Sequence, residues 1–166
     1  MIRFGGENME LGSLPFLVEL KDGPDNELQI VVAAEKIGEA GHIPDWADNV
    51  ELKNLIAPIR QIVPSEDNLW LITFEGYIMY TVRDESYSQY GQEEKSEGRV
   101  LKIFDESILL DYVMKATFIQ QFDDGKWFPG KWKHYAISTQ NHTVDVIAVD
   151  DPEVRRIRWN HEEKKE

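Results

Sequence analysis

The segment from Trp132 to Val149 constrains the fold most strongly, because apolar and polar residues alternate along it. An alternation with a period of two residues is typical of antiparallel strands that have one buried face. A two-residue turn at Asn141–His142 would pair Gln140 with Thr143 and carry the register along both strands. The face predicted to be buried then contains Tyr135, Ile137, Val144, Val146 and Ala148.

The opposite face of this hairpin holds His134, Ser138 and Asp145, three residue types that occur in hydrolase active sites. In the predicted register Ser138 lies opposite Asp145, whereas His134 lies four residues farther along its strand. At ~3.3 Å per residue the separation is roughly 13 Å, too far for a histidine to take a proton from a hydroxyl group. No nucleophile-elbow glycines surround Ser138. A hydrolase that uses His134 with Asp145 or Ser138 is therefore an alternative that the predicted geometry does not favour.

Two stretches of the N-terminal half also predict strands. Apolar runs at 16–21 and 28–34 flank a short connection that contains Gly, Pro and Asn, which indicates a first hairpin. Residues 69–83 are the segment richest in aromatic and β-branched residues. We interpret them as one long central strand with a bulge at Gly76, because Glu-Gly is a weak hairpin turn; two strands separated by a tight turn are the alternative.

The residues between these strands predict connections and a short helix. Glycines and a proline interrupt residues 36–49, which indicates a loop. Asp48 and Glu51 resemble a capping box, which predicts a short helix through Ile56. Residues 64–68 contain Pro, Ser, Asp and Asn, which favour a turn.

The C-terminal half predicts the principal helix, over residues 105–119, with Asp105 as its N-cap. Its apolar residues recur at helical spacing, and they are Ile108, Leu109, Tyr112, Val113 and Ala116. The helix lies between two polar connections, residues 84–98 and 120–131. A last short element is expected at 153–159.

Together these elements predict an α+β fold: a mainly antiparallel sheet of about six or seven strands, with one principal helix packed on it. A length of 166 residues suits a single domain over residues 1–166. Within it, residues 1–13 are expected to form an irregular lead-in and residues 160–166 a frayed tail.

The charge balance bears on the partners that the protein can bind. The chain has 18 basic and 31 acidic residues, and its formal net charge is -13. A field of this sign repels DNA, RNA and anionic lipid, so we expect no nucleic-acid or membrane partner, and it attracts basic partners. A role of the acidic residues in solubility alone is the alternative.

Several kinds of site are not expected. The chain has no cysteine, which excludes disulfides, thiolate metal sites and cysteine nucleophiles. The histidines are isolated and no phosphate-binding glycine loop joins a strand to a helix, so we expect neither a metal nor a cofactor. The N-terminus lacks the apolar core of a signal peptide, and no apolar run approaches ~18 residues. We therefore expect a cytoplasmic protein.

Acidic and aromatic residues are mixed in the two predicted loops. Tyr and Trp are frequent anchors at protein interfaces, and neighbouring charges steer a partner of opposite sign. The alternative is that the rings fold onto the core while the acids face water. The predicted partner-binding residues are Asp84, Glu85, Tyr87, Tyr90, Glu93 and Glu94 in the first loop, and Asp123, Asp124 and Trp127 in the second.

The stretch from Phe74 to Tyr87, the pair His134–Tyr135 and the segment from Asp145 to Glu153 resemble small acidic bacterial proteins of unassigned activity. Some such proteins are similar to the immunity partners of secreted toxins. The resemblance implies a cytoplasmic protein without a cofactor that binds a basic cognate toxin directly and blocks it. We therefore expect a non-enzymatic immunity-type inhibitor. The alternatives are the hydrolase above and an oligomerising structural domain that uses an exposed strand edge.

Overall fold

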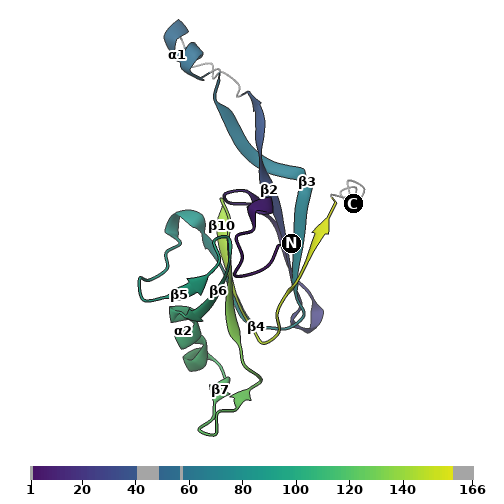
Figure 1. The fold of residues 1–166 in the computed structure, drawn as a ribbon, viewed down its shortest axis with the longest axis vertical. Coiled ribbons are helices and arrows are strands. Elements are labelled where there is room, and N and C mark those ends of the chain that lie inside the picture. Colours follow the sequence, from purple (N-terminus) through teal and green to yellow (C-terminus); the bar gives the residue numbers. More distant parts are fainter. Residues whose placement is uncertain (1, 41–48, 57, 159–166) are drawn as a thin grey trace.

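A computed structural model of the protein describes residues 2–40, 49–56 and 58–158. Within these ranges the chain forms eleven strands in two large antiparallel sheets and one small sheet (Figure 1). The helices are short, and no helix in the described ranges combines the length and apolar character needed to cross a membrane.

The two large sheets are built from strands that are distant in sequence. The four-stranded sheet has the order β1-β2-β3-β11, with bounds β1 (Phe16–Asp22), β2 (Leu28–Ala40), β3 (Arg60–Phe74) and β11 (Glu153–Ile157). The five-stranded sheet has the order β4-β10-β9-β6-β5, with bounds β4 (Tyr77–Asp84), β10 (His142–Ala148), β9 (Lys133–Ser138), β6 (Leu101–Glu106) and β5 (Lys95–Glu97).

The remaining elements are short. The small sheet pairs β7 (Gln120–Gln121) with β8 (Trp127–Phe128). The two α-helices are α1 (Val50–Ile56) and α2 (Ile108–Ala116), and three 3-10 turns complete the set: η1 (Met9–Leu11), η2 (Pro24–Asn26) and η3 (Glu85–Tyr87).

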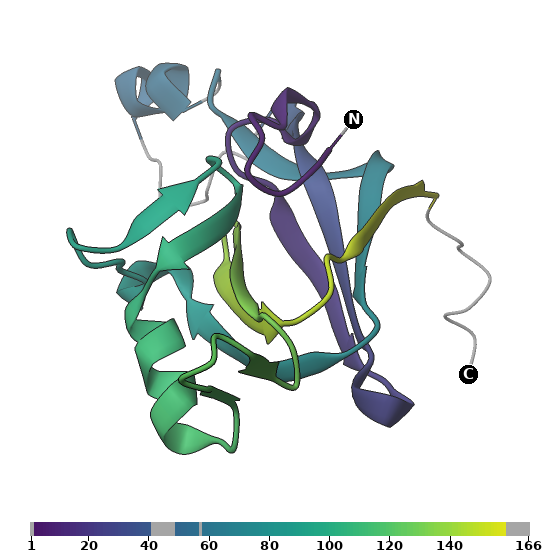
Figure 2. The same cartoon turned by 60° about the horizontal axis from the view of Figure 1, so that its bottom comes forward.

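The main core lies between the two large sheets, which face each other in Figure 2. The four-stranded sheet contributes alternate residues of β2 and β3, and the five-stranded sheet contributes alternate residues of β9 and β10. Burial of these side chains is the main source of stability, at roughly 25 cal/mol per Å² of apolar surface. The fully buried members include Leu28, Ile30, Val32, Ile72, Phe74, Tyr135, Ile137, Val144, Val146 and Ala148.

The face assignment of the central hairpin is confirmed, but its pairing register is displaced by two residues. Thr143 pairs with Ser138, and Asp145 lies opposite Ala136 rather than Ser138. A displacement of two residues leaves every side chain on its predicted face, because the side-chain period of a strand is also two. The hairpin closes through a 2.9 Å hydrogen bond from Thr139 N to His142 O, so the turn lies one residue earlier than predicted.

A distant contact fixes the position of this turn. The Asn141 side chain accepts a hydrogen bond from Leu17 N at 2.9 Å and donates one to Leu17 O at 3.0 Å. His142 N donates to the Thr139 hydroxyl at 2.9 Å. Contact with β1 therefore sets the position of the turn. The local sequence around Asn141 does not reveal this contact.

The outer face of the five-stranded sheet carries α2 and a second, smaller core. Val113 of α2 packs there with Ile119, Trp132 and Ile147. The predicted N-cap at Asp105 is wrong, because β6 continues to Glu106. The cap is Ser107, whose hydroxyl accepts a hydrogen bond from Leu110 N at 3.1 Å.

The prediction of an α+β fold with six or seven strands is wrong: the described chain is mostly β and has eleven strands. Several segments predicted as connections are strands. Residues 36–40 belong to β2, residues 64–68 belong to β3, and the two polar loops contain β5, β7 and β8. Pairing with a neighbouring strand outweighs the local turn preference of these residues. The predicted cap residue Asp48 and the tail at 160–166 lie outside the described residues.

The single long strand predicted over residues 69–83 is also wrong. It divides at Glu75–Gly76 into the end of β3 and the start of β4, and these two strands belong to different sheets. The chain thus crosses from one sheet to the other at this glycine, where an added Cβ would meet no atom within 4 Å. The predicted first hairpin is confirmed, with β1 and β2 joined by η2.

The turn between β5 and β6 provides a test of this fold. Gly98 has a φ of +90°, and a Cβ there would overlap the Leu101 carbonyl oxygen and lie 2.9 Å from Gly5 Cα. We predict that Gly98→Ala lowers the free energy of unfolding by roughly 1–2 kcal/mol for the backbone conformation and by roughly 1–3 kcal/mol more for the overlap. Urea denaturation followed by circular dichroism measures the sum of these two costs as the difference in the free energy of unfolding from wild type.

Gly125→Ala is the matched control, because Gly125 also has a positive φ of +81° but has no atom near the added Cβ. We expect it to show the backbone cost alone. Equal destabilisation by the two substitutions would contradict the close approach of Gly98 to Gly5.

Candidate functional site

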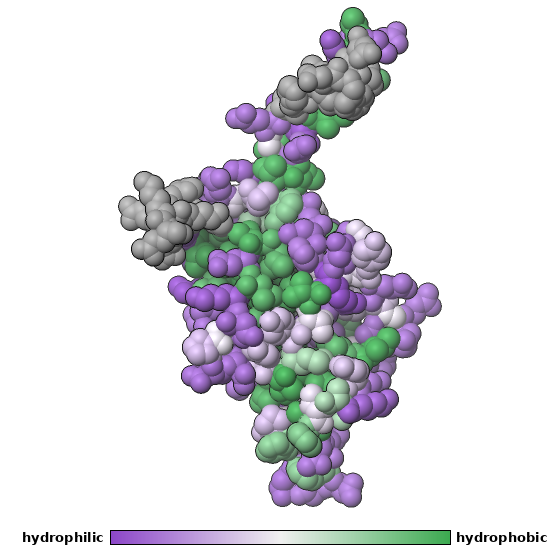
Figure 3. Space-filling view, turned by 180° about the vertical axis from the view of Figure 1, so that it is seen from behind, coloured by the Kyte–Doolittle hydropathy of each residue, from purple (hydrophilic) through white to green (hydrophobic). Residues whose placement is uncertain are grey.

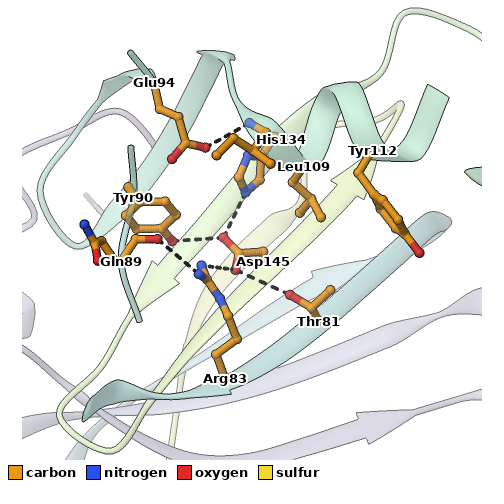
Figure 4. A pocket seen from close by; sticks show the side chains of 10 residues that line it. Thr81, Arg83, Gln89, Tyr90, Glu94, Leu109, Tyr112, His134 and Asp145 are labelled. Atoms are coloured by element: carbon orange, nitrogen blue, oxygen red, sulfur yellow. Dashed lines mark hydrogen bonds and ion pairs between the residues drawn. The ribbon is translucent and has the colours of Figure 1, made fainter. Parts of the chain in front are cut away.

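A buried carboxylate, Asp145, lies on the outer face of the five-stranded sheet and is only 1% exposed. Asp145 follows Val144 on β10, so the strand alternation turns it away from the main core. Both carboxylate oxygens are engaged (Figure 4). Oδ1 accepts from His134 at 2.9 Å and from the Tyr90 hydroxyl at 2.9 Å, and Oδ2 accepts from Arg83 at 2.7 Å and from the Thr81 hydroxyl at 3.4 Å.

His134 connects this carboxylate to the start of α2. Its ring is 1% exposed and stacks on Phe104 with 4.3 Å between the ring centroids. Nε2 lies 2.9 Å from Asp145 Oδ1, and it must carry a hydrogen because a carboxylate only accepts. Nδ1 lies 2.8 Å from Oγ of Ser107, the N-cap of α2. Asp145 thus holds the histidine, and the histidine contacts the residue that begins the helix.

Arg83 and Tyr90 connect the same carboxylate to the predicted loop at 84–98. Arg83 Nη1 donates to the Gln89 carbonyl at 3.3 Å, and its guanidinium carbon lies 5.1 Å from the centre of the Tyr90 ring. Lys102 Nζ lies 4.6 Å from the same ring centre. Contacts of a cation with an aromatic ring at this distance are favourable. The ring is therefore held by its hydroxyl group and by two cations.

The surroundings of Asp145 decide its ionisation. Burial by itself would raise the pKa of Asp145. Three neighbours oppose it: His134 through its hydrogen bond and charge, Arg83 through its charge, and Tyr90 through its hydrogen bond. The pKa of Asp145 is therefore below its usual value of 3.8. Burial, together with the negative charge of Asp145, raises the pKa of the Tyr90 hydroxyl. The carboxylate is therefore charged and the phenol is a hydrogen-bond donor at neutral pH.

Glu94 closes the loop onto α2. Its carboxylate accepts a 3.0 Å hydrogen bond from Ile108 N and another from Gly91 N. Ile108 is the first residue of α2, so a negative charge lies where the partial positive charge of the helix is concentrated. The loop at 84–98 is consequently fixed at two points: Tyr90 is bonded to Asp145 of the sheet, and Glu94 is bonded to Ile108 of α2.

These side chains enclose a pocket of about 450 Å³ (Figure 4). His134 and Asp145 form part of its lining beside Arg83. Tyr90 and Glu94 line it from the loop, and α2 lines it with Ile108, Leu109 and Tyr112. The pocket therefore combines apolar walls with a few fixed polar groups, as binding sites commonly do.

The structure places two of the six predicted residues of the first loop at the pocket, and it places those of the second loop elsewhere. Of the first group, Tyr90 and Glu94 line the pocket and are partly buried. The others are exposed, and they are Asp84, Glu85, Tyr87 and Glu93.

The second group lies in the β7–β8 region, which follows the opposite end of α2 (Figure 1). There Trp127 packs edge-on against Trp132, with 4.3 Å between the ring centroids, and borders the smaller core. Asp124 forms an exposed ion pair with Lys126 at 2.7 Å, and Asp123 is exposed. These three residues therefore do not border the pocket.

Sequence reasoning assigned no site role to several contributors, which are Thr81, Arg83, Gln89, Ser107, Ile108, Leu109 and Tyr112. The predicted register separates His134 from Asp145 by roughly 13 Å along the strand. This prediction is wrong, because His134 Nε2 lies 2.9 Å from Asp145 Oδ1. The displaced register puts Asp145 opposite Ala136, two residues from His134, so the two side chains meet diagonally. Tyr112, predicted to face the core, is 55% exposed at the pocket mouth, and no local signal distinguishes that position from Val113.

The arrangement does not favour hydrolysis. Both ring nitrogens of His134 are hydrogen-bonded within the protein, so neither faces a substrate. Glu94 occupies the N-terminus of α2, where its charge would repel an oxyanion. Among the described residues no group of three or more His, Asp or Glu side chains could hold a metal ion.

Comparison with protein-family models, curated proteins and solved structures shows no match to this chain. The function is therefore inferred from the geometry and charge of the site.

The buried carboxylate gives a prediction for stability and its pH dependence. We expect Asp145→Asn to lower the free energy of unfolding by roughly 3 kcal/mol at pH 7, because Arg83 then loses its counter-charge. Folding favours the ionised carboxylate, since the folded-state pKa is lowered. Its contribution is therefore complete above the usual value of 3.8 and is lost as the pH falls through the lower folded pKa.

Urea denaturation at a series of pH values measures the difference between wild type and Asp145→Asn, which should shrink at acid pH. The exposed Asp123→Asn is the control and should change stability by less than about 0.5 kcal/mol. A difference that grows as the pH falls would contradict the assigned role of Asp145.

Proposed function

We propose that the protein is a non-enzymatic binding protein that holds a basic protein partner over the mouth of this pocket, as an immunity-type inhibitor holds its toxin. The observation that carries the proposal is an acidic loop, held by bonds to buried groups, that lies beside α2 and shares with it the exposed side chains Tyr87, Ile108 and Tyr112. The mouth comprises the loop at 84–94 and the first turns of α2.

The charge of the mouth supports a basic partner. Residues 84–94 contain four carboxylates and no basic residue, within a chain of net charge -13. Asp84, Glu85 and Glu93 are exposed. The cations on either side of the loop are paired with carboxylates, Arg83 with Asp145 and Lys95 with Glu106. Such a surface raises the association rate of a cationic protein and disfavours acidic ones.

The exposed apolar side chains supply contact area. Tyr87 is 86% exposed, Ile108 is 60% exposed and Tyr112 is 55% exposed. Tyrosine is enriched among the residues that contribute most to binding, because it offers a large surface at a low entropy cost. These side chains and the carboxylates together offer both parts of an interface, apolar anchors and a charged rim.

The buried network makes the mouth ready to bind. A loop that is already ordered loses little entropy when a partner arrives, so more of the contact energy appears as affinity. The bonds of Tyr90 to Asp145 and of Glu94 to Ile108 hold the loop in this way. The role of the buried histidine and carboxylate is therefore to position the surface.

The proposal predicts that substitutions at the mouth weaken partner binding. The wild-type protein, immobilised, is used to capture basic proteins from a lysate of its native host, and the purified captured protein is titrated by calorimetry. We expect the triple variant Glu85→Lys, Tyr87→Ala, Glu93→Lys to bind it at least about tenfold more weakly. We also expect wild-type affinity to fall with added salt.

The control variant Glu19→Lys, Met9→Ala, Glu66→Lys makes the same change in net charge at exposed positions elsewhere, and it should bind like wild type. Equal weakening by both variants would mean that net charge alone draws the partner. Unchanged affinity of the mouth variant would overturn the proposal.

A further inference from the structure

The pocket below the proposed binding surface contains a carboxylate without a paired cation. Glu94 lines this pocket, is half-buried, and forms no ion pair with any residue in the described part of the chain. Its hydrogen bonds from Ile108 N and Gly91 N favour the ionised form, but a backbone amide has no net charge with which to cancel it. The negative charge of Glu94 is therefore available to a ligand.

The cations near Glu94 are engaged by other groups. Arg83 and His134 line the same pocket, and both are bonded to Asp145, at 2.7 and 2.9 Å. Nζ of Lys102 lies 4.6 Å from the centre of the Tyr90 ring, and Lys102 does not line the pocket. A cation that enters the pocket would therefore find a carboxylate that these three side chains leave unpaired.

Apolar side chains form part of the wall and of the edge of this pocket. Ile108, Leu109 and Tyr112 of α2 line it. In Figure 4 the Glu94 carboxylate lies on one side of the pocket and the Tyr112 ring on the other. Ile108 and Tyr112 are also 60% and 55% exposed, so they belong to the mouth as well. A partner that binds the mouth therefore covers the opening of the pocket.

Covering this opening is unfavourable unless the partner supplies a counter-charge. It would exclude water from Glu94, and a carboxylate removed from water without a paired cation is costly. Apolar contact alone does not select the mouth, because exposed side chains such as Ile37 and Ile62 also lie along the narrow projection of β2 and β3 (Figure 3). The unpaired carboxylate of Glu94 therefore decides which chemical group the pocket accepts.

We infer that the pocket receives a lysine or arginine side chain of the partner, with its charged end at Glu94 and its methylene stem against the side chains of α2. Lysine and arginine combine a cation with an apolar stem, so they match both parts of the lining. The inference rests on the proposed function, since it names the group by which the basic partner is recognised. A charge pair that the surrounding interface shields from water contributes more to affinity than a pair at the exposed rim.

The free full-length protein is titrated with capped lysine (Nα-acetyl-lysine methylamide) and with the corresponding capped arginine, and amide chemical shifts are followed by NMR. We expect at least one of these probes to bind saturably, with a Kd on the order of 1–10 mM, and to shift the amides of Glu94 and Ile108. Capped norleucine has a similar stem without the charge, and it should bind at least about fivefold more weakly.

The variant Glu94→Gln should weaken binding of the charged probe at least about fivefold. The control Glu97→Gln makes the same substitution at an exposed position that does not line the pocket, and it should leave the affinity unchanged. If the amide shifts reveal that Glu94→Gln loosens the loop, Tyr112→Ala is the second variant. It removes part of the pocket wall without removing a bond that holds the loop, and it should also weaken binding.

Equal affinity for capped norleucine, or no saturable binding of either charged probe, would overturn the inference. Both results leave the proposed function in place, because the mouth variant and the captured partner decide that proposal. Probe binding combined with an unchanged partner affinity of the mouth variant would mean that the pocket takes a free cation. That result would overturn the assignment of the pocket to a partner side chain.

Discussion

The buried carboxylate of Asp145 is the constraint on which the outer side of the molecule depends. A charge at this depth is stable only when it is paired and fully hydrogen-bonded. Four side chains from three segments meet that requirement: Thr81 and Arg83 of β4, Tyr90 of the loop after it and His134 of β9. Satisfying one carboxylate therefore fixes the end of β4, the loop that follows it and, through Ser107, the start of α2.

The same arrangement links packing to function. The inner face of the five-stranded sheet is apolar and buries the main core, whereas its outer face carries a polar cluster under a loop and a helix. A polar cluster adds little net stability compared with an apolar one, but it specifies a single arrangement of the groups around it. In this protein that arrangement presents acidic and aromatic side chains at a fixed pocket mouth, which suits recognition of a basic protein.

The sequence carried the local information in this structure and lacked the information that depends on distant contacts. The alternation along β9 and β10 predicted which residues face the core, because a register displaced by two keeps the faces. The position of their turn could not be predicted, since Asn141 is bound by Leu17. The strand through Pro64 was hidden for a similar reason: pairing with Glu35 overrides its turn preference. Tyr90 and Glu94 were found from composition, but the groups that anchor them, the Asp145 carboxylate and Ile108 N, lie on elements distant in sequence.

Amide hydrogen exchange of the 84–94 loop tests the central claim most directly, because it reports loop order in the free protein. The account predicts that amides of this loop bonded within the site, such as Gly91 N, exchange slowly in wild type. It also predicts that Tyr90→Phe, which removes one bond to Asp145, speeds their exchange while amides of β2 in the main core are unchanged. Rapid exchange throughout the loop in the wild-type protein would contradict a surface held ready by the buried carboxylate.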